Sequence, residues 1–210
     1  LEQQSLPLLS KATGEAILKT TPMFQQFMKV KAENDDCLLF FRMGDFYELF
    51  FEDAVIASNE LDIALTSRGQ YDGKPVPMCG VPYHSYMPYL EKLTKKNYKI
   101  AICEQVESPK DAKIRGGYKA IVQREVVRIV TPGTLTEEVL LEADKNNFLL
   151  CISYSKNNIG LSWIDISTGE IYTELCSKQN FLTSISRVRP KEILACLLYT
   201  SDAADEGLGV

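Results

Sequence analysis

The chain is organised around ten consecutive residues, Phe41-Arg42-Met43-Gly44-Asp45-Phe46-Tyr47-Glu48-Leu49-Phe50. An apolar run leads into them from Cys37, and such a run is typical of a strand buried on both faces. Gly44 and Asp45 then predict a tight turn. Because apolar residues recur at helical spacing beyond this turn, we expect an amphipathic helix to follow it directly and to extend to Leu61.

The aromatic and acidic residues just after the turn have two interpretations. Asp45 and Glu48 have the spacing of a capping box, and the helix dipole favours a carboxylate at the position of Glu48. Phe46 would then be one more core aromatic. Alternatively, Phe46, Tyr47 and Glu48 stand at an exposed strand-to-helix corner, where side chains leave the core and contact a partner. The local pattern alone favours the capped helix.

The composition is that of an ordinary globular protein. Of 210 residues, 45% are hydrophobic and 24% are charged, which suits one large domain or one domain with part of another. No apolar run is long enough to span a bilayer and no signal peptide precedes the first domain, so we expect a cytoplasmic protein with no membrane partner. Six scattered cysteines and a single histidine predict free, buried thiols and no zinc site.

Positive charge is concentrated in one segment of the chain. The formal net charge is −5, yet residues 67–128 contain twelve Lys or Arg against six Asp or Glu. Such asymmetry is a hint of a surface that faces a polyanion. Lysines on loops and helices are usually only solvated, so charge alone does not establish a nucleic-acid site.

The order of the expected elements indicates an α/β fold in two domains. We expect an irregular segment at 1–19 within a first domain at 1–130, a linker at 131–147 and part of a second domain at 148–195. The predicted strands of the first domain are 37–43, 61–65, 76–82, 99–106 and 121–130, and its predicted helices are 21–31, 46–61 and 85–96. A turn-rich segment is expected at 67–77 and a polar loop at 108–118.

The second domain is expected to begin as an antiparallel meander. Strands at 148–154, 159–166 and 170–175 are joined by short turns, and a helix at 178–188 precedes a further strand from Glu192. The residues from Cys196 onward resemble the in-frame translation of a sequencing adaptor. We therefore interpret 196–210 as an artefactual tail.

Ordered sequence motifs add a family resemblance to these patterns. The first three are TPMFQQF at 21–27, FFRMGDFYELF at 40–50 and LTSRG at 65–69. They are followed by VPMCGVPYH at 76–84, AICEQ at 101–105 and VRIVTPG at 127–133. In this order they resemble the N-terminal mismatch-binding domain of the MutS family of DNA mismatch repair proteins. The resemblance implies a mixed sheet flanked by helices, followed by the truncated start of an RNase H-like connector domain.

The resemblance also assigns roles to particular residues. A Phe-x-Glu motif is the mismatch reader of that family, and here it falls on Phe46 and Glu48. The implied mechanism inserts Phe46 between base steps from the minor groove, while Glu48 forms a hydrogen bond to the displaced base. If the base accepts through a purine N7, Glu48 must hold a proton, which requires a raised pKa in the complex. Further candidates for DNA contacts are Met43, Arg68, Lys74, Lys110 and Lys113.

The same resemblance implies cofactors and partners of a longer protein. Family members bind mismatched double-stranded DNA as homodimers, use ATP and Mg²⁺, and act with a repair partner of the MutL type. No G-x-x-x-x-G-K-[ST] loop occurs in this chain. We therefore expect a DNA-binding module that is not an enzyme and has no catalytic residue, no metal site and no cofactor of its own.

Two other function classes stay open. A metal-dependent, RNase H-like nuclease is one, because Asp165 lies where such nucleases carry a metal carboxylate, although only Glu170 is close to it in sequence. The other is a protein-docking module, because the connector of the family passes signals between the DNA clamp and the ATPase domains.

Overall fold

The computed structural model describes residues 21–137, 140–141, 145–155 and 158–195. The chain divides into two compact units, residues 1–130 and 131–210, which are described separately. The mixed α/β fold class expected from the sequence is confirmed. Among the described helices, none has the length and apolar character needed to cross a membrane. The adaptor-like residues 196–210 lie outside the described residues.

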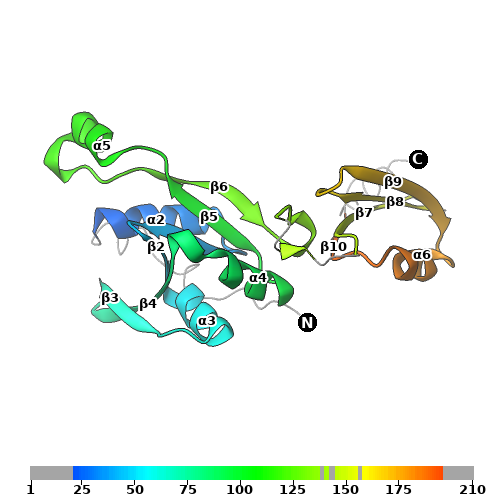
Figure 1. Cartoon of the computed structure of the whole chain (residues 1–210), viewed down its shortest axis with the longest axis horizontal. Helices are drawn as coiled ribbons and strands as arrows, with labels where there is room; N and C mark the ends of the chain where they lie inside the picture. The colour runs from blue at the N-terminus through cyan, green and yellow to red at the C-terminus, as the bar shows by residue number, and fades with distance from the viewer. Residues whose placement is uncertain (1–20, 138–139, 142–144, 156–157, 196–210) are drawn as a thin grey trace, which may run out of the picture. The chain divides into compact units, whose positions relative to one another are not determined.

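The first unit is a six-stranded mixed sheet with helices on both faces (Figure 1). Its strand order is β3-β4-β2-β1-β5-β6, in which β1 and β5 are parallel and the other neighbours are antiparallel. The strands are β1 (Leu38–Met43), β2 (Phe46–Phe50), β3 (Thr66–Tyr71), β4 (Lys74–Pro82), β5 (Ile100–Gln105) and β6 (Arg124–Val130). The helices are α2 (Pro22–Ala32), α3 (Phe51–Leu61), α4 (Met87–Lys95) and α5 (Pro109–Gly116), with short 3-10 turns η1 (Tyr83–Ser85) and η2 (Gly117–Lys119).

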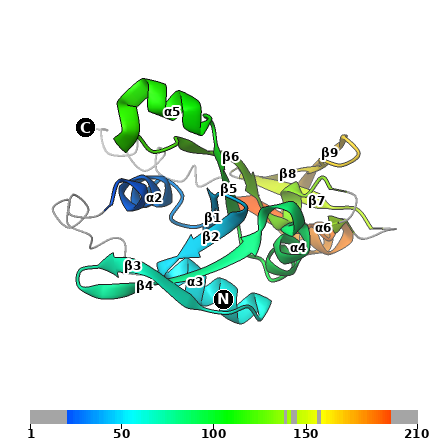
Figure 2. The same ribbon diagram turned by 60° about the vertical axis from the view of Figure 1, so that its left-hand side comes forward.

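Helix α2 covers one face of this sheet, and α3 and α4 contact each other over the opposite face (Figure 2). Phe27 of α2 is fully buried and makes edge-on ring contacts with Phe41 of β1 and Phe50 of β2. On the other face, the ring of Tyr47 meets Tyr86, which immediately precedes α4. Side chains of successive strand residues therefore point to opposite faces of the sheet and pack into two different cores.

The prediction of a helix at 46–61 is wrong for residues 46–50, which form strand β2. Gly44 and Asp45 close a two-residue hairpin, because Met43 pairs with Phe46 and β1 continues antiparallel into β2. Gly44 adopts a φ of 59°, which the first residue of such a loop favours. The four-residue spacing of Phe46, Phe50 and Ala54 imitates a helix, but residues 46–50 alternate with the period of a strand.

The switch from β2 to α3 is held by a buried carboxylate. Phe51 has a φ of 55°, so the chain turns sharply where the strand ends. Asp53, in the first turn of α3, accepts a 3.0 Å hydrogen bond from the backbone N–H of Leu39 in β1. It also forms a 3.0 Å ion pair with Lys31 of α2. One side chain therefore joins α2, β1 and α3.

Four further expectations need correction. Residues 66–71 and 74–82 form the β3–β4 hairpin, so the segment expected to be turn-rich is mostly strand, and the strand expected at 61–65 lies at 66–71 instead. The predicted polar loop at 108–118 contains helix α5, which Ser108 caps by accepting from the N–H of Asp111 at 3.2 Å. The helix predicted from Ser85 begins at Met87.

The expected cap of α2 is confirmed. Thr21 is the N-cap and Pro22 occupies the first helical position. Among the cysteines of the described segments, four are buried free thiols as expected: Cys37, Cys79, Cys103 and Cys176. Cys151 is exposed, contrary to that expectation.

The second unit contains a four-stranded sheet of order β10-β7-β8-β9. The strands are β7 (Phe148–Tyr154), β8 (Asn158–Asp165), β9 (Glu170–Ser177) and β10 (Glu192–Ala195); η3 (Pro132–Thr134) precedes them and α6 (Phe181–Val188) follows β9. The predicted antiparallel meander of β7, β8 and β9 is confirmed, and β10 adds in parallel to β7. Trp163 and Val188 belong to the separate core of this unit.

Candidate nucleic-acid interface

Strand β2 presents Phe46 and Glu48 on the same face of the sheet, because they are two residues apart. This is the face that α2 covers, since Phe50 further along β2 packs under that helix. Phe46 stands at the hairpin end of the strand and is 47% exposed, whereas Glu48 is half-buried. An exposed aromatic side chain and a partly desolvated carboxylate therefore lie side by side on β2.

The alternate residues of β2 fix the strand to the opposite core. Tyr47 is 1% exposed and Leu49 is fully buried. The hydroxyl of Tyr47 donates a short hydrogen bond to Glu104 of β5, and burial is the main cause of a raised pKa of Tyr47. Anchoring on one side of the strand makes the other side a rigid platform for Phe46.

Glu48 is paired with an arginine from the edge of the sheet. The Nη1 atom of Arg68 in β3 lies 2.6 Å from Oε1 and 2.7 Å from Oε2 of Glu48. The side chain of Glu48 is 12% exposed and that of Arg68 is 44% exposed. Arg68 therefore reaches across β4, which lies between β3 and β2, and partly covers the carboxylate.

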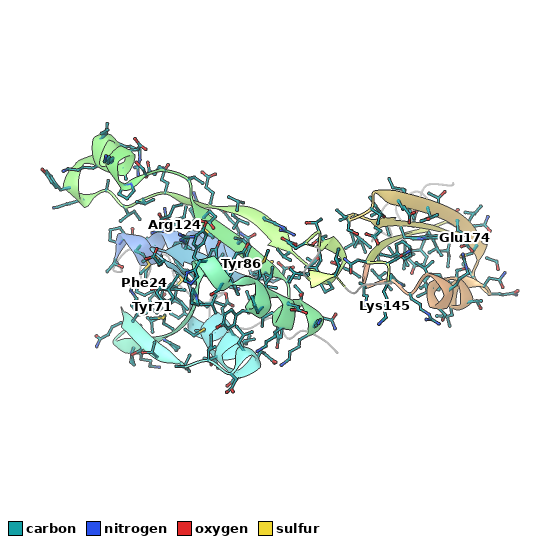
Figure 3. All side chains as sticks on the ribbon, in the orientation of Figure 1. Phe24, Tyr71, Tyr86, Arg124, Lys145 and Glu174 are labelled. Atoms are coloured by element: carbon teal, nitrogen blue, oxygen red, sulfur yellow. The ribbon has the colours of Figure 1, made fainter. Side chains whose placement is uncertain are left out.

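The environment of Glu48 raises its carboxyl pKa. Burial penalises the charged form, and the positive charges of Arg68 and Arg124 oppose this effect only in part. Arg124 lies at the start of β6 (Figure 3). It donates to the backbone carbonyl of Arg42 at 2.6 Å and to the amide oxygen of Gln26 in α2 at 3.0 Å. Burial also lowers the pKa of Arg124.

A glycine leaves space beside the pair. Gly80 of β4 lies opposite Glu48 in the strand register. A Cβ atom at this position would lie 3.7 Å from Cγ of Glu48 and 3.9 Å from Cδ1 of Phe46. A side chain at position 80 would therefore contact both Phe46 and Glu48.

The structure brings some of the predicted contact residues together and leaves others apart. Met43 pairs with Phe46 across the hairpin and packs against the core under α2. Arg68 contacts Glu48, as described above. Lys74 lies at the exposed end of the β3–β4 hairpin, and Lys110 and Lys113 lie in α5. Among the described contacts, none joins these three lysines to Phe46 or Glu48.

Sequence patterns missed two residues of this site. Arg124 lies outside the sequence motifs, at the start of a strand in which residues alternate, and its sequence context does not distinguish it from a surface arginine. Only the structure shows that it is close enough to Glu48 to affect its pKa. Gly80 lies inside the motif VPMCGVPYH, where an isolated glycine within a strand signals a close approach to that strand. That signal was available in the sequence.

Comparison with known proteins fits this geometry. Residues 21–139 match the family described as MutS domain I, and residues 147–205 match MutS domain II. The chain belongs to the MutS family. Its relatives include proteins named DNA mismatch repair protein MutS from Rickettsia canadensis, 50% identical over 176 residues, and from Roseobacter denitrificans, 50% identical over 177 residues. These alignments cover 83% and 84% of this chain but 20% of each relative, so the chain spans about a fifth of their length.

The two MutS matches correspond closely to the two structural units. The domain I match contains the six-stranded sheet with Phe46 and Glu48, and the domain II match begins at the meander. The domain II match extends into residues 196–205, whose structure is not described. The interpretation of that segment as a sequencing adaptor stays a prediction.

The carboxylate of Asp165, in the region that matches MutS domain II, accepts hydrogen bonds around the turn that follows β8. It accepts from the N–H of Asn147 at 2.8 Å and from the hydroxyl of Ser167 at 2.6 Å. Although burial acts to raise it, hydrogen bonds from Ser167 and Asn147 lower the pKa of Asp165. Within the described residues, no group of three or more His, Cys, Asp or Glu side chains has the arrangement of a metal site. The hydrogen bonds of Asp165 are therefore those of a carboxylate that stabilises a turn.

Proposed function

We propose that the first unit recognises mispaired or looped-out bases in duplex DNA, with Phe46 as the inserting residue and Glu48 as the hydrogen-bonding partner of the displaced base. The observation that carries this proposal is the exposure of Phe46 on a rigid strand, beside a half-buried carboxylate, in a chain of the MutS family. Other large apolar side chains of the described segments are exposed as well, so the combination of Phe46 with Glu48 and the MutS domain I match supports this role, not exposure alone.

Insertion of Phe46 discriminates by the cost of opening the base stack. A side chain that wedges between base steps from the minor groove must unstack them, which costs a few kcal/mol per step. A mispaired or looped-out base is already poorly stacked and paired, so the cost is smaller at such a site. The protein then recognises local deformability of DNA rather than a base sequence.

Glu48 adds a hydrogen bond that depends on its protonation. A carboxylate can only accept, whereas a protonated carboxyl can donate to an acceptor such as a purine N7. Partial burial of Glu48 already raises its pKa, which lowers the cost of holding that proton. The desolvation that accompanies DNA binding would act in the same direction.

Cations of the first unit are suited to neutralise the DNA backbone. Arg68 and Lys74 lie on the β3–β4 hairpin, and Lys110 and Lys113 lie on α5, which follows β5. Because β5 runs parallel to β1, the segment that carries α5 leaves the sheet at the same end as the hairpin that precedes Phe46. Phosphate contacts of this kind would set affinity without adding specificity.

The remaining expectations concern a longer protein and are also proposals. ATP and Mg²⁺ binding, homodimer formation and action with a MutL-type partner would require the parts of the relatives that this chain does not span. A cytoplasmic location fits these roles. A docking role of the second unit stays a prediction, and the environment of Asp165 gives no support to a nuclease.

The proposed function is tested by equilibrium binding to a duplex with one mispair and to its perfectly paired counterpart. For the unchanged chain we expect tighter binding to the mispaired duplex. Phe46→Ala should abolish the difference while the circular dichroism spectrum stays unchanged. Tyr154→Ala is a matched control, because Tyr154 is 45% exposed in the second unit, and it should leave the difference intact. A difference that survives Phe46→Ala would contradict the proposal.

A further inference from the structure

The ion pair between Arg68 and Glu48 has a geometry that competes with base recognition. A single guanidinium nitrogen lies within 2.7 Å of both carboxylate oxygens, so it occupies the carboxylate from the side of β3. Among the described residues, no other side chain donates a hydrogen bond to Glu48. A base that used Glu48 as a hydrogen-bond donor would therefore have to displace Arg68 first.

We propose that Arg68 is a releasable counter-ion that sets the energetic threshold for mismatch recognition. In the free protein it keeps Glu48 ionised and turned toward β3. When Glu48 engages a displaced base, Arg68 leaves the carboxyl and pairs with a DNA phosphate. This inference rests on the proposed function and identifies Arg68 as a positioning residue that acts through Glu48.

The exchange is chemically balanced. Glu48 takes up one proton from solvent and loses its attraction for the guanidinium, which remains charged at all relevant pH values. The released cation needs a new anion, and a DNA phosphate accepts the same planar donor group. Arg68 is suited to leave, because its side chain is 44% exposed and forms no other described hydrogen bond.

The other cation near Glu48 is not released in the same way. Arg68 from β3 and Arg124 from β6 are the charged groups that act on Glu48. Arg124 donates to the carbonyl of Arg42, the amide oxygen of Gln26 and the carbonyl of Val122. It is therefore held by three acceptors, whereas Arg68 is held by Glu48 alone among the described residues.

A first experiment tests the ion pair without DNA. The titration of the Glu48 carboxyl is followed by carbon-13 NMR in the unchanged chain and in Arg68→Gln. We expect a higher pKa of Glu48 in the variant, because burial is then opposed by Arg124 alone. Arg187→Gln is the matched control, since it removes an arginine paired with Glu174 in the second unit and should not move the titration. An unchanged pKa in Arg68→Gln would overturn the proposal.

A second experiment tests the exchange on DNA. Arg68→Gln should reduce the salt slope by about one for the mispaired duplex and leave it unchanged for the paired duplex, since the phosphate contact forms only when Glu48 engages a displaced base. At high salt, where a phosphate contact contributes little, the ratio of mispaired to paired affinity should rise by about twofold to fivefold, because an ion pair of this exposure no longer has to be broken. A salt slope that changes equally for both duplexes, or a high-salt ratio that does not rise, would overturn the exchange while the proposed function still holds. A wild-type chain with no mismatch preference would overturn both.

Discussion

Successive side chains of β2 point to opposite faces of the sheet and have different roles. Tyr47 and Leu49 enter one core and hold the strand in place, while Phe46 and Glu48 leave the sheet on the other face. The family motif identified Phe46 and Glu48 in the sequence, but the helical spacing assigned them to a helix. The ion pair with Arg68 could not be predicted, since it joins β2 to a strand that is not its neighbour.

Glu48→Gln tests whether a neutral donor satisfies the site. The glutamine amide donates a hydrogen bond at every pH, so we expect the variant to keep its preference for a mispaired duplex. In the unchanged chain the raised pKa means that the protonated form of Glu48 gains population as pH falls, and mismatch affinity should rise with it. The variant should show no such rise in binding titrations between pH 5 and pH 8.

The control for this pH profile is Glu60→Gln, which neutralises a carboxylate that pairs with Lys96 at the surface. It should retain the pH dependence of the unchanged chain. Complete loss of mismatch preference in Glu48→Gln, with binding to paired DNA preserved, would contradict a protonated carboxyl at Glu48.

At the scale of elements, the junction of α2, β1 and α3 depends on the buried pair of Lys31 and Asp53. Lys31→Met leaves the Asp53 carboxylate buried without its cation, and we expect the free energy of unfolding to fall by about 3–5 kcal/mol. Adding Asp53→Asn removes the charge but keeps an acceptor for the N–H of Leu39. The double variant should recover part of the loss in urea denaturation. A single variant within about 0.5 kcal/mol of the unchanged chain would contradict this account.

The sequence predicted elements well where one physical signal dominated. A continuous apolar run located β1, alternation located β5, and Thr21-Pro22 located the start of α2. The β2 strand was missed because its aromatic spacing also satisfies a helix, and α5 was missed because a polar, solvent-facing helix has no apolar face. The β3 strand is almost entirely exposed, so it offers no alternation to recognise.

At the scale of the whole molecule, each unit has its own core, and the turn after β8 stabilises the second unit through Asp165. Hydrogen bonding lowers the pKa of this carboxyl in the folded state, so its contribution to stability is present at neutral pH. That contribution is lost as pH falls through the lowered pKa. Asp165→Asn should therefore cost about 1–3 kcal/mol at pH 7 and less in acid.

Trp163 is the one tryptophan of the sequence and lies in the core of the second unit, so its fluorescence follows the unfolding of that unit. The difference between Asp165→Asn and the unchanged chain is measured by denaturation at several pH values. A loss of stability that is equal at pH 7 and below pH 3 would contradict the assigned role of the carboxylate.

The central claim is that Phe46 opens the base stack at a mispair. The most direct measurement places 2-aminopurine, whose fluorescence increases when it unstacks, beside a single mispair. We predict that saturating amounts of the unchanged chain raise the emission from the mispaired duplex and not from the paired one, and that Phe46→Ala binds without raising it. An equal rise with Phe46→Ala, or no rise with the unchanged chain at saturation, would contradict the account.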